Sequence, residues 1–141
     1  DMDNIKFLMS LDRGKLEIKP TKKVMARNLS RIAGEDVFVT LTAISGDRHQ
    51  SIAARAYGKD GKLDPDRMYD VQALLVSEAI TDPDVKDPEL LRHFQAATPK
   101  ELVKLLFPGG ELVKLSEEEA SLSGFGVDAE DTFEFAKVKN S

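Results

Sequence analysis

The pattern of apolar positions and helix-breaking residues is clearest over residues 98–110, which predict a short helix. Thr98 can accept from the first free N–H groups of this helix, and Glu101 can reach back to the Thr98 N–H, which makes a capping box. Pro99 stands where its missing donor costs nothing. The apolar residues that follow are Leu102, Val103, Leu105, Leu106 and Phe107. Residues 108–110, Pro-Gly-Gly, then end the helix.

The residues after this break predict two further helices, each with its own signals. The first has leucines on one side and residues 117–119, all Glu, mostly on the other. Gly124 supplies its left-handed stop. Asp128 is predicted to cap the second helix. The apolar positions of the two helices are Leu112, Leu115 and Leu122 in the first, and Ala129, Phe133 and Ala136 in the second.

The N-terminal residues predict a short helix followed by two strands. Asp3 is an N-cap candidate, and Ile5, Leu8, Met9 and Leu11 predict an amphipathic helix that ends near Gly14. A terminal helix of this kind, within residues 1–14, often docks loosely. Residues 15–20 are expected to be extended.

Residues 22–28 alternate weakly and residues 36–43 alternate strongly between apolar and polar side chains. The two segments predict an antiparallel hairpin, joined through residues 29–34, where there is room for a helical turn. An isolated hairpin is marginal in water, so it must pack on the helices. In the stronger strand, one face has Val37, Val39, Leu41 and Ala43, and the other has Phe38, Thr40 and Thr42.

The middle of the chain predicts a central helix. Ser45 begins a helical stripe that Gly58 stops, and Asp64 with Pro65 then opens the most apolar helix, residues 65–80. Its apolar side chains cover more than one face, so it is expected to pack on two sides. A short helix follows from Asp87, with Leu90, Leu91 and Phe94 as its apolar residues. The sequence therefore predicts one α+β domain over residues 1–141, mostly helical, with a small hairpin near the N-terminus.

Composition narrows the classes of protein. The chain has 141 residues, of which 41% are hydrophobic and 32% charged, and this suits one domain with a real core. The absence of Cys excludes disulfides, thiolate metal sites and cysteine nucleophiles. No apolar run approaches the roughly 20 residues of a membrane span, so no membrane partner is expected.

The net charge of −5 is unevenly distributed, with a basic first quarter and an acidic last quarter. Two solvated faces are the simpler interpretation, and complementary surfaces for self-association or for a charged partner are the alternative. The basic residues are Lys15, Lys19, Lys22, Lys23, Arg27 and Arg31, and the acidic ones are Glu117, Glu118, Glu119, Asp128, Glu130, Asp131 and Glu134.

Signatures of catalysis and of ligand binding are missing from the sequence. His49 and His93 lie far apart without a metal-ligand spacing, which favours packing or surface roles. Residues 58–62, GKDGK, are too short for a phosphate-binding loop and lack the Ser or Thr after the Lys. The aspartates of residues 60–70 do not follow the order of a calcium loop. We therefore predict no catalytic residue, no metal site and no cofactor.

The order LLFPGGELVKLS followed by SLSGFGVDAEDTFEFAK resembles the tail assembly chaperones of phages and of PBSX-like defective prophages of Gram-positive bacteria. In that family a leucine-rich helix meets a Pro-Gly break, and a helix, a short SGFG turn and an acidic capped helix follow. The resemblance is best over residues 82–140 and is collinear over residues 2–57.

The resemblance implies a non-enzymatic assembly factor of a long-tailed phage. It implies a chaperone that coats the tape measure protein, a long helical chain with exposed apolar stripes, and helps to recruit the major tail tube protein. Such a chaperone works in the host bacterial cytoplasm and is absent from the mature virion.

Apolar residues of the C-terminal half exceed what such short helices need in order to form, and the breaks between these helices can leave a groove. A groove lined by Leu and Phe accepts an amphipathic helix, although the same side chains can equally form the core. The partner-binding residues that we expect are Phe94, Leu106, Phe107, Leu112, Leu115 and Phe125.

Two other classes of protein stay open at this point. One is a structural tail or connector protein that remains in the particle. The other is a nucleic-acid-binding regulator that uses the basic first quarter, although this quarter lacks interleaved aromatic residues and a helix-turn-helix pattern.

Overall fold

The computed structural model describes residues 2–125, and they form a mostly helical α+β fold, as the sequence predicts. The helices are α1 (Asn4–Met9), α2 (Arg13–Glu17), α3 (Arg27–Ala33), α4 (Gly46–Ala53), the 3-10 helix η1 (Ala54–Ala56), α5 (Pro65–Ala79), α6 (Pro88–His93), α7 (Pro99–Leu106) and α8 (Gly110–Leu122). The strands are β1 (Thr21–Met25), β2 (Phe38–Thr42) and β3 (Ile80–Asp82). The predicted helix capped by Asp128 lies outside the described residues.

The predicted hairpin is present, and it belongs to an antiparallel sheet in the order β1-β2-β3. Val24 pairs with Val39, and Met25 pairs with Phe38. The alternation in β2 has the predicted consequence, because Val39 and Leu41 are buried. The third strand was not predicted, since its three residues follow directly on α5 and show no period of their own. The segment between β1 and β2 forms the whole helix α3 rather than a single turn.

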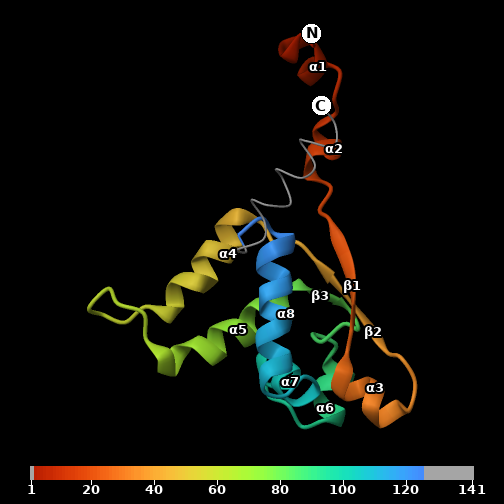
Figure 1. The fold of residues 1–141 in the computed structure, drawn as a ribbon, viewed down its shortest axis with the longest axis vertical. Helices are drawn as coiled ribbons and strands as arrows, with labels where there is room; N and C mark the ends of the chain where they lie inside the picture. The colour runs from red at the N-terminus through yellow and green to blue at the C-terminus, as the bar shows by residue number, and fades with distance from the viewer. Residues whose placement is uncertain (1, 126–141) are drawn as a thin grey trace.

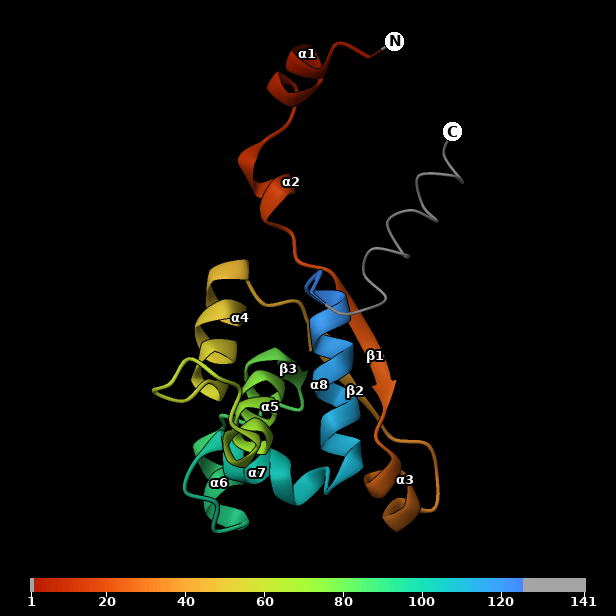
Figure 2. The same cartoon turned by 60° about the vertical axis from the view of Figure 1, so that its left-hand side comes forward.

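The core lies between the helices and the inner face of the sheet. Helix α5 contacts α4, α7 and α8, which confirms the prediction of a central helix packed on more than one side. Figures 1 and 2 show α8 lying between α5 and the strands β1 and β2. The largest cluster of buried residues joins Leu41 of β2, Val76 of α5 and Leu112 of α8.

Most of the predicted helix boundaries are confirmed by their caps. Ser45, Asp64 and Asp87 accept backbone hydrogen bonds at the starts of α4, α5 and α6. Thr98 Oγ1 accepts from the Glu101 N–H at 3.3 Å. The Glu101 carboxylate accepts from the Ala97 N–H at 3.2 Å, one residue before the predicted Thr98.

The N-terminal residues form an arm that extends away from the rest of the molecule (Figures 1 and 2). Asp3 caps α1 as predicted, accepting from the Ile5 and Lys6 N–H groups. The prediction of one helix that ends near Gly14 and an extended segment from residue 15 is wrong. The chain ends α1 at Met9, passes through an extended Asp12 and forms the second helix, α2, around Gly14.

Candidate partner-binding surface

The arm is the most exposed apolar element of the described residues. Neither α1 nor α2 has a buried residue. Ile5, Leu8 and Met9 stand at positions i, i+3 and i+4 and are 74%, 55% and 82% exposed, so they form one apolar stripe along α1. Such a stripe is uncovered in this structure and has the spacing with which a helix packs against another helix.

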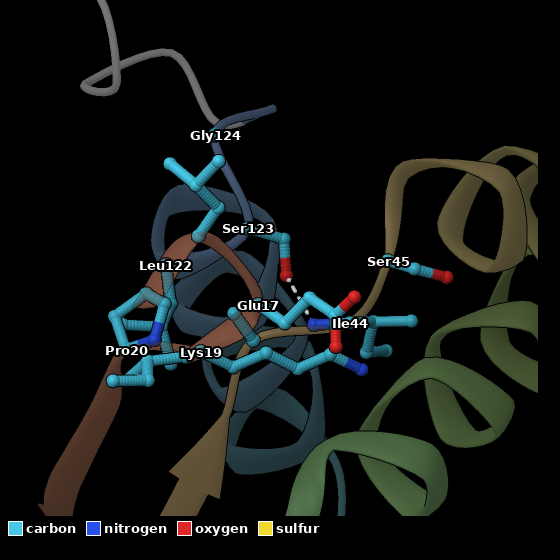
Figure 3. A pocket seen from close by; sticks show the side chains of 11 residues that line it. Glu17, Lys19, Pro20, Ile44, Ser45, Leu122, Ser123 and Gly124 are labelled. Carbon is cyan, nitrogen blue, oxygen red and sulfur yellow. Dashed lines mark hydrogen bonds between the residues drawn. The ribbon is translucent and has the colours of Figure 1, made fainter. Parts of the chain in front are cut away.

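An open groove of about 610 Å³ lies at the base of the arm (Figure 3). Three segments that are distant in the sequence form its walls: residues 16–20 at the root of the arm, residues 43–45 between β2 and α4, and residues 122–124 at the end of α8. Its apolar lining consists of Leu16, Ile18, Pro20, Ala43, Ile44 and Leu122. The groove therefore continues the apolar surface of the arm onto the body of the molecule.

A series of hydrogen bonds, partly buried next to the groove and fully buried at His49, connects two of these walls. The Ile44 amide donates to Ser123 Oγ at 2.9 Å, which Figure 3 shows as a dashed line, and Ser123 Oγ donates to Glu119 Oε2 at 2.8 Å. His49 Nδ1 lies 2.9 Å from the same carboxylate oxygen. The His49 ring stacks on Phe125, with ring centroids 4.3 Å apart.

The burial of Glu119 corrects the sequence interpretation, which placed residues 117–119 mostly on the solvated side of the helix. Glu119 is 0% exposed, and its partner His49 is also buried. His49 therefore has a packing role, one of the two roles expected for it. The pairing was missed because the two residues are 70 positions apart, and neither shows a local signal of burial.

The six predicted partner-binding residues do not form one surface. Phe107, Leu112 and Leu115 are at most 2% exposed and belong to the core, so the expectation that they line an open groove is wrong for this fold. Leu106 is partly buried against that core. Phe94 and Phe125 keep about two fifths of their surface exposed, on α6 and after α8 respectively.

Ion pairs hold the helices of the body together. Arg48 of α4 donates to Glu78 of α5 at 2.9 Å, and this hydrogen bond lowers the pKa of the Glu78 carboxyl below its usual range. Lys104 of α7 pairs with Asp70 of α5 and lowers the pKa of Asp70. Lys22 of the basic first quarter lies 2.6 Å from Glu118 of α8, so part of this basic surface is already paired with acidic residues.

The described residues also bear on metal binding and on membrane insertion. Residues 2–125 contain no group of three His, Cys, Asp or Glu side chains placed to hold a metal ion. Within the same residues, no helix has both the length and the apolar character needed to cross a membrane.

Comparisons with known proteins give a family and a fold. The model of a family described as phage XkdN-like tail assembly chaperone protein matches residues 5–137. A crystal structure titled as that of the protein yqbn is similar, with 22% sequence identity and a TM-score of 0.55. The match covers 89% of this chain and 97% of the other, and at this identity it supports the fold alone. No curated protein matches.

Proposed function

The chain belongs to the phage XkdN-like tail assembly chaperone family, and from this premise we propose that it binds and shields the tape measure protein during tail assembly. The proposed role is non-enzymatic. The chaperone covers apolar stripes of a long helical client in the host bacterial cytoplasm, helps the major tail tube protein to assemble around it, and is then released from the particle.

The uncovered stripe of α1 is the observation that carries this proposal. An isolated helix of six residues is marginal in water, so α1 gains order when its apolar side packs on another helix. Burial of Ile5 and Met9 by a client contributes about 3–6 kcal/mol gross, and ordering of the arm offsets part of it. Contacts of this strength are reversible, as release by the growing tube requires.

The groove at the base of the arm extends the proposed contact. A client helix that lies along α1 can continue toward the groove lining of residues 16–20 and 43–45, where Glu17 and Lys19 stand among the apolar side chains. Phe125 follows the third wall of the groove and stays a candidate contact. Phe94, the residue that follows α6, is a separate candidate, because it is not part of the groove lining.

Co-expression with the tape measure protein of the same phage tests the proposal. The unaltered chain should keep the client soluble and co-purify with it. The double variant Ile5→Asp with Met9→Asp should lose both effects, since a charge within the stripe prevents apolar contact. The matched control is Ile32→Asp with Leu63→Asp, which places two charges on exposed apolar residues outside the arm. Equal rescue by both variants would contradict a role for the arm.

The two other classes of protein predict different results. A structural tail protein is found in purified particles at a stoichiometric level, whereas a released chaperone is absent from them. A nucleic-acid-binding regulator shows steep salt-dependent binding to DNA that Lys22→Ala with Lys23→Ala abolishes. We expect neither result, and either one would replace the chaperone proposal.

A further inference from the structure

The series of hydrogen bonds from Ile44 through Ser123 and Glu119 to His49 joins elements that are far apart in the chain. The Ile44–Ser123 bond spans 79 positions and the His49–Glu119 bond spans 70. Ile44 and Ser123 both line the groove and join two of its walls directly, while Glu119 and His49 are buried beside them. The series therefore fixes the end of α8 relative to the connection between β2 and α4.

Burial of Glu119 carries a large desolvation cost. Removing a carboxylate from water costs several kcal/mol, and an ion pair offsets that cost only when every polar atom has a partner. Within residues 2–125, Glu119 Oε1 is buried and has no hydrogen-bond partner. Apolar side chains that replace both partners of such a pair often stabilise the fold at least as well. Stability alone therefore does not account for a glutamate at position 119.

We propose that Glu119, Ser123 and His49 are positioning residues. They hold the groove wall of residues 43–45 at a fixed distance from the wall of residues 122–124, and this fixed distance keeps the groove in the shape that binds the partner. Ser123 is central, because its hydroxyl accepts from one wall and donates to the glutamate behind the other. Phe125, three residues after the end of α8, stacks on His49, so its position also depends on this series of hydrogen bonds. This inference rests on the proposed function for its partner, while the geometric part concerns the free protein.

The spacing of the walls can be measured without any client. The chain contains no native Cys, so the exposed positions Asp47 on α4 and Glu117 on α8 can be changed to Cys and spin-labelled as the only pair. Ser123→Ala leaves the Ile44 N–H without its acceptor, and we expect a broader distribution of distances between the two labels. The matched control is Ser116→Ala, since Ser116 is a buried serine of α8 that bonds only within its own helix.

A second variant separates positioning from stability. His49→Leu with Glu119→Leu replaces both partners of the buried pair by apolar side chains of similar volume, and the melting temperature of this double variant should equal or exceed that of the unaltered chain. The label distances should nevertheless broaden, and binding of the tape measure protein should weaken about tenfold relative to Ser116→Ala. Native distances in both Ser123→Ala and the double variant His49→Leu with Glu119→Leu would overturn the inference. Broadened distances without any client binding by the unaltered chain would leave the positioning role intact and count against the proposed function instead.

Discussion

Phe107 gives the sharpest test of which apolar residues form the core. The sequence places Phe107 in a partner-binding groove, whereas the structure buries it completely at the end of α7, within a cluster that includes Leu102 and Leu112. Phe107→Ala removes a whole aromatic ring from this cluster and leaves a cavity. Changes of this kind cost about 3–5 kcal/mol. A domain of ordinary size has only about 5–15 kcal/mol of stability in total.

This cost should lower the melting temperature by about 10–25 °C for a domain of this length, and the urea midpoint should fall with it. Circular dichroism during heating and urea titration measures both. Leu105→Ala is the matched control, because Leu105 lies two residues earlier and is 54% exposed. Its effect on the free energy of unfolding should stay within about 0.5 kcal/mol. If Phe107→Ala melts like the unaltered chain but loses the client, Phe107 belongs to a partner surface and the assignment to the core is refuted.

Two further predictions concern a turn and an ion pair. Gly109 has φ +63°, so Gly109→Ala should lower the free energy of unfolding by about 1–3 kcal/mol. Gly110→Ala, at the first position of α8, should not lower it, and urea titration of the two variants compares these free energies. In the folded state the pKa of Glu78 lies below its ordinary 4.5, because Arg48 donates a hydrogen bond to its carboxylate. Its contribution to stability is therefore present above pH 4.5 and is lost as the pH falls through the lower folded pKa. The melting temperature should therefore depend less steeply on pH between pH 5 and about 2.5 in Glu78→Gln than in the unaltered chain. The same pH dependence in both proteins would contradict the assignment.

Local patterns were sufficient to predict most of the elements. The central helix, the two helices on either side of the Pro-Gly-Gly break and the hairpin all have a clear period and clear caps, and each is present. Strand β3 has only three residues and therefore no period, and it is defined by its pairing with β2. The restart of the chain as α2 depends on the extended backbone at Asp12, which the pattern of Ile5, Leu8, Met9 and Leu11 does not encode.

The candidate site could be predicted much less well, because periodicity shows which side of a helix is apolar but not what covers that side. The apolar positions of α1 and of α7 look alike in the sequence. In the structure the stripe of α1 is exposed, whereas Leu102 and Val103 of α7 are buried, as is Phe107 directly after it. The same limit applies to charge. Glu117 is exposed and Glu119 is buried two positions later, because only Glu119 faces His49.

The arm has a consequence for how such chaperones diversify. Because α1 and α2 contribute no residue to the core, mutations in the arm are not constrained by the folding of the body. Residues 2–18 can therefore change in sequence while the scaffold stays unchanged. Under the proposed function, grafting this segment from one relative onto another should transfer the preference for a client between the two chains.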